Sequence, residues 1–174
     1  MSTTKLEANL WRIDLPNGAL PIDYTLMRRD TYNDDPSKLL RPTHKVIVVD
    51  LPKFIQLVEL APASFVVPPA AEWGTQELEG RTEFTAPYLS NNPRGNGSIL
   101  MPVVGHHFRI VSEPRPAWRF WEPERARKVY HATYTNGRHR TRLVEYGGAL
   151  TMPVEVDPSS VNFYIETCGM RIER

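Results

Sequence analysis

Three arginines and a histidine, spaced at alternate positions on either side of an Asn-Gly pair, are the residues of this chain best suited to binding a negative charge. Arg138, Arg140 and Arg142 follow the pair, and His131 and Thr133 precede it. The planar guanidinium group of arginine pairs with a carboxylate or a phosphate through two parallel hydrogen bonds. These five residues therefore predict a binding site for acidic side chains or for phosphate groups.

The elements that would position this row are two strands joined by a tight turn. Asn136-Gly137 lies between alternating runs and predicts a β-hairpin over 129–145, because a type I′ turn needs positive φ at both central residues. In that register the row occupies the outward face, while Tyr130 and Leu143 share the inward face. A shift by one residue would turn the arginines inward, where burial of unpaired charge opposes it. We expect the arginines to span about 14 Å.

Three interpretations of this face stay open: a charged edge that discourages unwanted strand pairing, a site for an acidic protein partner, or a site for nucleic acid. Residues 109–142 hold nine of the 21 basic residues and three acids, whereas the whole chain has a net charge of +1. A local basic face on a near-neutral protein favours a specific anionic partner over general adhesion to polyanions. Trp118, Phe120 and Trp121 would add base stacking, but such clusters are more typical of a core or a subunit contact.

The sequence contains no catalytic or cofactor motif. His106 and His107 follow Gly105, but neighbours on a strand point to opposite faces, so we do not expect them to bind one metal ion. Cys168 is the single cysteine, which excludes an intramolecular disulfide and a zinc site built from cysteine pairs. We expect neither a metal nor a cofactor. An enzyme with a site assembled around His106/His107 or His131 is the second alternative.

The proline content indicates the fold class. Sixteen prolines among 174 residues are well above the usual share of about 5%. Proline lacks a backbone donor and is excluded from helix interiors and from central strands. The chain is therefore predicted to be mainly β: a single domain over 1–174, an antiparallel β-sandwich or barrel with long proline-rich loops and at most one or two short helices.

Four segments carry the clearest local expectations. The β-branched run 46–49 predicts a buried strand. Residues 50–60 fit a helix or a strand, and the helical spacing of the apolar residues, with Asp50 as a cap, favours the helix. Residues 158–168 also fit either a helix or a strand, and the β-like remainder of the chain favours a strand there. The proline-rich apolar segment 61–73 either covers the core of its own fold or forms an extended arm on a neighbouring subunit.

The remaining features concern location and partners. The first residues lack the apolar run of a secretory signal, and no stretch is apolar enough to span a membrane. We therefore expect a cytoplasmic or virion location. A small, cysteine-poor, proline-rich β-protein with an apolar extended segment resembles the subunits of viral or phage particles, such as decoration or connector proteins.

That resemblance implies a non-enzymatic structural or assembly subunit that binds other protein chains, as a homo-oligomer or within a larger assembly. The first alternative is a nucleic-acid or polyanion-binding module that uses the predicted hairpin face with Arg138, Arg140 and Arg142.

Overall fold

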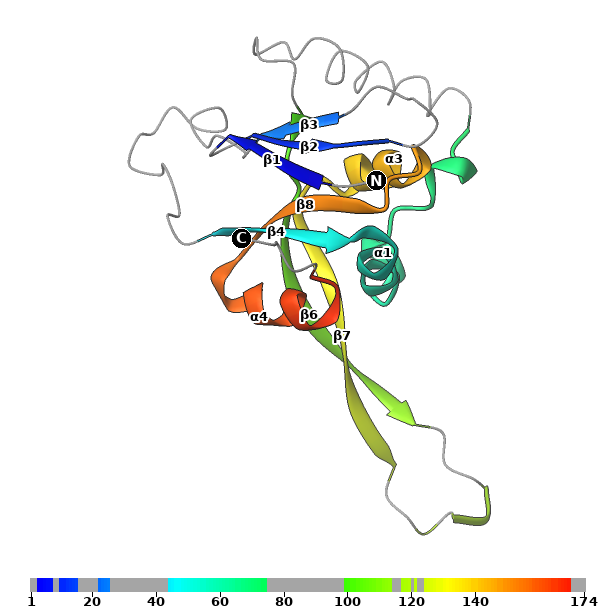
Figure 1. The fold of residues 1–174 in the computed structure, drawn as a ribbon. Helices are drawn as coiled ribbons and strands as arrows, with labels where there is room; N and C mark the ends of the chain where they lie inside the picture. The colour runs from blue at the N-terminus through cyan, green and yellow to red at the C-terminus, as the bar shows by residue number, and fades with distance from the viewer. Residues whose placement is uncertain are drawn as a thin grey trace, which may run out of the picture.

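Strands predominate in the structure, a computed structural model of the chain (Figure 1). It describes residues 3–7, 10–15, 22–25, 44–74, 99–113, 117–119, 121 and 124–169. These residues form two four-stranded sheets and three short α-helices, and neither sheet closes into a barrel. The predicted mainly β fold with few short helices is confirmed. The predicted barrel is wrong, and both sheets are mixed where antiparallel sheets were predicted, because each contains one parallel pair. The described residues also hold one α-helix more than expected, and a sandwich stays a prediction.

The first sheet has the order β1-β2-β3-β5 and the second the order β4-β8-β6-β7. The strands of the first are β1 (Thr3–Glu7), β2 (Leu10–Ile13), β3 (Ile22–Thr25) and β5 (Ile99–Leu100). Those of the second are β4 (Lys45–Asp50), β8 (Thr151–Val156), β6 (Val103–Glu113) and β7 (Arg125–Asn136). Neighbouring strands are antiparallel, except that β5 runs parallel to β3 and β8 runs parallel to β6.

The core lies around β4 and β8. Ile47, Val48 and Val49 are buried, which confirms the predicted buried strand, and every residue of β8 is buried. Trp11 and Ile13 of β2 belong to the same apolar cluster, so the two sheets share one core. Removing this apolar surface from water is the main term that stabilises the fold.

Residues after β4 form the helix that the apolar spacing favoured. Helix α1 spans Leu51–Glu59 and buries Leu51, Phe54, Ile55 and Val58 along one face. The side chain of Asp50 accepts a hydrogen bond from the Lys53 N–H at 3.0 Å, and a proline stands in the first turn. Both are favourable helix starts, since the first N–H groups have no partner within the helix. The helix prediction over 50–60 is confirmed.

The strand favoured for 158–168 is wrong. The chain forms the 3-10 helix η7 (Pro158–Ser160) and then helix α4 (Val161–Thr167). The Asp157 carboxylate accepts a hydrogen bond from the Ser159 N–H at 2.8 Å, which supports the helical start. Val161 and Tyr164 are buried three positions apart, a spacing that a strand would place on opposite faces.

The segment 61–73 packs on its own chain. It forms the 3-10 helices η4 (Ala63–Phe65) and η5 (Ala70–Glu72). Val67, Ala70 and Trp73 make a small buried cluster against Leu143, a residue of helix α3 (Arg138–Tyr146). The Trp73 ring also lies edge-on to the His139 ring, with centroids 6.0 Å apart. The segment 61–73 therefore covers part of its own fold, by packing on helix α3.

Strands β6 and β7 continue beyond the sheet as a two-stranded projection. Strand β8 pairs with β6 only at Val103 and Val104, whereas the β6–β7 ladder runs on to Glu113 opposite Arg125. Figure 1 shows this ladder extending well away from the body of the molecule. We call residues 105–113 and 125–133, with the described residues at their tip, the ribbon. Within the described part of the chain, no helix is long and apolar enough to cross a membrane.

Candidate binding site on the projecting ribbon

The predicted hairpin over 129–145 is wrong, although its first strand exists. Strand β7 ends at Asn136, but its partner is β6: Tyr134 lies opposite Val104, and His131 lies opposite His107. Gly137 does adopt positive φ, at 96°, but it immediately precedes helix α3 and does not reverse the chain into a second strand. A residue in the left-handed region needs positive φ whether it lies before a helix or in a turn. Glycine adopts positive φ without steric cost, so the sequence fits both structures.

The structure therefore separates the five residues of the predicted row. Arg142 is buried, Arg138 is exposed, and Arg140 is half-buried, because residues two apart on a helix do not share a face. His131 is buried and Thr133 is half-buried on β7. The single outward face with Arg138, Arg140 and Arg142 is not formed. A binding role for the exposed Arg138 stays a prediction.

Arg142 is held by three groups from three segments. Its Nη1 donates to Glu145 at 2.8 Å, its Nη2 to Glu59 at 3.1 Å, and its Nε to the carbonyl oxygen of Val67 at 2.9 Å. Its side chain is 2% exposed. This arginine links α3 to α1 and to the segment 61–73, so its function is structural.

The ribbon has two chemically different faces, because opposed residues of an antiparallel ladder point to the same side. One face is largely apolar and carries His106 with Ala132, Phe108 with Tyr130, and Ile110 with Lys128. The other is largely charged and carries His107 with His131, Arg109 with Val129, Val111 with Arg127, and Glu113 with Arg125. The sequence prediction noted this basic and aromatic stretch but did not pair these two strands.

The apolar face stays open along the outer part of the ribbon. The rings of Phe108 and Tyr130 are in contact, with centroids 5.7 Å apart, and the Lys128 Nζ lies 4.3 Å from the Phe108 centroid. Ile110 is 69% exposed and Tyr130 is 42% exposed. Ile110 and the Tyr130 ring are thus exposed to solvent beside the Lys128 ammonium group. Exposed apolar surfaces of this kind are common where proteins bind partners.

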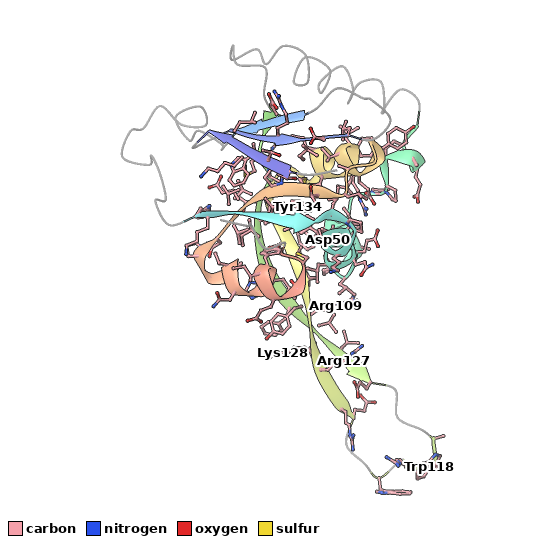
Figure 2. All side chains as sticks on the ribbon, viewed as in Figure 1. Asp50, Arg109, Trp118, Arg127, Lys128 and Tyr134 are labelled. Atoms are coloured by element: carbon pink, nitrogen blue, oxygen red, sulfur yellow. The ribbon has the colours of Figure 1, made fainter. Side chains whose placement is uncertain are left out.

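The tip and the charged face add aromatic and basic groups (Figure 2). Trp118 and Trp121 are both more than 60% exposed, and the Arg119 guanidinium lies 4.4 Å from the Trp118 ring. Residues 109–128 contain six basic and three acidic residues, a net charge of +3. One of these acids, Glu113, lies 3.7 Å from Arg127. Figure 2 shows Arg109, Arg127 and Lys128 along the ribbon and Trp118 at its end.

At its base the ribbon is joined to α4 through His106. The His106 ring stacks on Phe163 with centroids 4.6 Å apart, and its Nδ1 lies 2.7 Å from the Ser160 hydroxyl oxygen. The Ser160 hydroxyl oxygen also accepts the backbone N–H of His106 at 3.1 Å, so Ser160 contacts both the ring and the backbone of this histidine. Burial, and secondarily the neighbouring His107, lowers the pKa of His106.

This serine–histidine contact does not favour the enzyme alternative. Ser160 is 2% exposed, so a substrate has no access to its hydroxyl. The Cys168 thiol is buried as well, and burial raises its pKa to about 11, which keeps the reactive thiolate scarce near neutral pH. Among the residues that the structure describes, no group of three or more histidine, cysteine, aspartate or glutamate side chains is arranged to hold a metal ion.

Comparisons with known proteins extend the description of the fold. No family model matches the chain, and no curated protein matches it in sequence. The structure is similar to the crystal structure of Oncogenic Suppression Activity Protein, a plasmid fertility inhibition factor, solved as a gold(I) cyanide derivative. The TM-score is 0.59 at 11% sequence identity, over 98% of this chain and 77% of that chain. At this identity the likeness concerns the fold alone.

Proposed function

We propose that this protein is a non-enzymatic binding protein whose ribbon contacts an acidic surface of another protein chain. The observation that carries the proposal is the ribbon itself, which presents exposed apolar and aromatic side chains together with a net positive charge. A place in a viral or phage particle stays a prediction from composition. The structural neighbour is described as an inhibition factor, and inhibition can be achieved by binding alone, so its description is compatible with this proposal.

The ribbon is difficult to explain as a purely structural element. A two-stranded hairpin by itself is marginally stable in water. Its outer residues add little to the core, since Ile110, Trp118 and Trp121 are each more than 60% exposed. Aromatic residues and arginine are enriched at protein interfaces, where they account for most of the binding energy. A partner that covered these side chains would stabilise the ribbon and gain affinity from them.

Charge and apolarity together indicate the kind of partner. Two copies of the ribbon placed face to face would oppose one net charge of +3 with another, which disfavours self-association through it. A nucleic acid would pair with the arginines but leave Ile110 and the Phe108–Tyr130 pair uncovered. An acidic surface that receives the ribbon in a groove with one apolar wall can contact both faces, because the two faces point to opposite sides of the ladder.

The partner can be identified by photo-crosslinking and then tested by affinity. A photoreactive phenylalanine analogue at position 126, exposed on the apolar face, should cross-link to one protein chain in cells. The same analogue at Gln56, exposed on α1, is the matched control and should not. The affinity for the purified partner is then measured. Ile110→Ser or Lys128→Glu should weaken this binding at least about tenfold, or 1.4 kcal/mol.

The outcomes of this experiment separate the alternatives. Gln56→Ser should bind with unchanged affinity, and all variants should keep the parent melting temperature because the changed residues are exposed. Equal affinity of Ile110→Ser and the parent protein would contradict the proposal. Cross-links from position 126 to nucleic acid alone would replace it with the polyanion-binding alternative.

A second candidate function rests on the first turn of α3. Gly137 precedes the helix and, having no side chain, makes no capping hydrogen bond to it. The positive end of the helix dipole lies there, beside the exposed Arg138. This arrangement suits one phosphate or carboxylate group. The polyanion-binding alternative is thereby retained for a single anionic group at Arg138, in place of several groups along a row of three arginines.

Titration with inorganic phosphate tests this candidate. We expect the amide resonance of Arg138 to shift on adding phosphate, because its N–H group would donate to the anion. Arg138→Gln should reduce the phosphate affinity about tenfold, the loss of roughly 1.4 kcal/mol for one charge-assisted hydrogen bond. Arg127→Gln, on the ribbon, is the control. Shifts that are absent, or that persist unchanged in Arg138→Gln, would exclude an anion site at α3.

A further inference from the structure

We propose that His107 and His131 form a cross-strand binding site for a divalent transition-metal ion of the zinc type, at the base of the ribbon. The two residues lie directly opposite each other on β6 and β7 and therefore point to the same face of the ladder. The site goes beyond the proposed function, because it does not depend on the identity of any partner. It also differs from the His106/His107 pair of the sequence, whose members point to opposite faces.

The separation of the two rings suits a shared ion. Their centroids are 6.0 Å apart, with the ring planes inclined at 45°. Two imidazoles that ligate one ion through bonds of about 2.0–2.1 Å have ring centres roughly 5–6 Å apart. The ring centres therefore already lie at about the separation that a shared ion requires.

The hydrogen bonds of both rings fix the nitrogen that a metal would use. The Nδ1 of His107 lies 2.8 Å from the carbonyl oxygen of Phe108, and the Nδ1 of His131 lies 3.2 Å from that of Ala132. A carbonyl oxygen only accepts, so each Nδ1 carries the hydrogen, and the lone pair of the neutral ring is on Nε2. Metal-ligating histidines commonly donate their other ring N–H to a backbone carbonyl in this way.

The exposures of the two residues allow entry and set the coordination. His107 is exposed, while His131 is 5% exposed, so an ion would arrive from the His107 side. Because the described residues include no group of three or more ligating side chains, the remaining coordination positions would be taken by water. Such a two-ligand site binds zinc more weakly than the closed four-ligand sites that stabilise zinc fingers.

Bound metal would act as a clip where the ribbon leaves the sheet. From Gly105 outward β6 no longer pairs with β8, and its strand partner among the described residues is β7. A link between His107 and His131 adds a second connection at that point. Since an isolated two-stranded ladder is marginal, we expect metal to slow the opening of the ribbon.

Calorimetric titration of the full chain with zinc chloride tests the proposal. We expect one zinc ion per chain, and His107→Ala or His131→Ala should weaken the affinity at least about tenfold, by loss of one of the two ligands. His106→Gln is the matched control, because His106 is the neighbouring histidine on the opposite face, and it should bind zinc with unchanged affinity. Absence of zinc binding, or equal weakening by His106→Gln and His107→Ala, would overturn the proposal.

A second measurement keeps the test independent of folding, because His131 is buried and its replacement can destabilise the chain. In the unsubstituted protein, zinc should shift the ring resonances of His107 and His131. The ring of His44, which contacts Glu155 of β8 at 2.8 Å, should keep its resonances unchanged. Zinc should also slow hydrogen exchange of the amides in 105–113 and 125–133. Resonance shifts confined to other histidines would contradict a zinc site at His107 and His131. Unchanged hydrogen exchange would contradict a link between the two strands through the bound metal.

Discussion

Replacing Arg142 by methionine is expected to lower the free energy of unfolding by about 3 kcal/mol. Methionine fills a similar volume but donates no hydrogen bond. The carbonyl oxygen of Val67 loses its donor, and an unsatisfied buried acceptor costs about 1–3 kcal/mol. Glu59 and Glu145 lose the cation that both contact, but their side chains are 51% and 35% exposed and regain water. The expected loss therefore lies at the lower end of the range for a broken buried ion pair.

Urea unfolding followed by tryptophan fluorescence measures this loss, since Trp73 packs in the cluster beside Arg142. Arg138→Met is the matched control: it removes an arginine from the same helix, but from an exposed position, and should change stability by less than about 0.5 kcal/mol. Equal stability of the two variants would show that Arg142 does not hold α1, α3 and the segment 61–73 together.

Replacing Gly137 by alanine is expected to lower the free energy of unfolding by about 2–3 kcal/mol. The residue has φ of 96°, and a residue with a Cβ is strained in that region. A Cβ at this position would also lie 2.8 Å from the Cα of Pro102, where a backbone atom has to move to make room. The strain and the overlap act together at the junction of β7 and α3.

Two further variants separate these causes. Gly74→Ala is the control for the change itself, because a Cβ there meets nothing within 4 Å, and it should leave stability within about 0.5 kcal/mol. Gly137→Asn tolerates positive φ better than alanine but still carries the Cβ. If Gly137→Asn loses as much stability as Gly137→Ala, contact with Pro102 dominates, whereas a much smaller loss assigns the effect to φ. No loss in either variant would contradict the close approach.

The candidate site could be located from the sequence but not built from it. The concentration of basic and aromatic residues over 109–142 is evident in the sequence, and the ribbon lies within it. The pairing of β6 with β7 was missed because the Asn-Gly signal favoured the shorter connection between 129 and 145. The true connection runs through the tip of the ribbon, where no Asn-Gly or Asp-Gly pair marks a turn.

The sequence alone determined those elements whose partners are a few residues away. The β-branched run 46–49 is a buried strand, and 51–59 is a helix because its apolar spacing and the Asp50 cap are local properties. The dominance of strands likewise follows from the proline content and the alternating runs.

Only the tertiary structure decided the roles of residues whose local preferences fit two conformations. Positive φ at Gly137 suits both a hairpin turn and a helix start, and packing of α3 against the segment 61–73 selected the helix. Burial of Tyr164 selected a helix for 161–167. Arg142 was predicted to face outward, yet its partners Glu59 and Val67 lie 83 and 75 residues away in the chain. Contacts over such separations leave no local pattern, so the fold determined which arginine is structural.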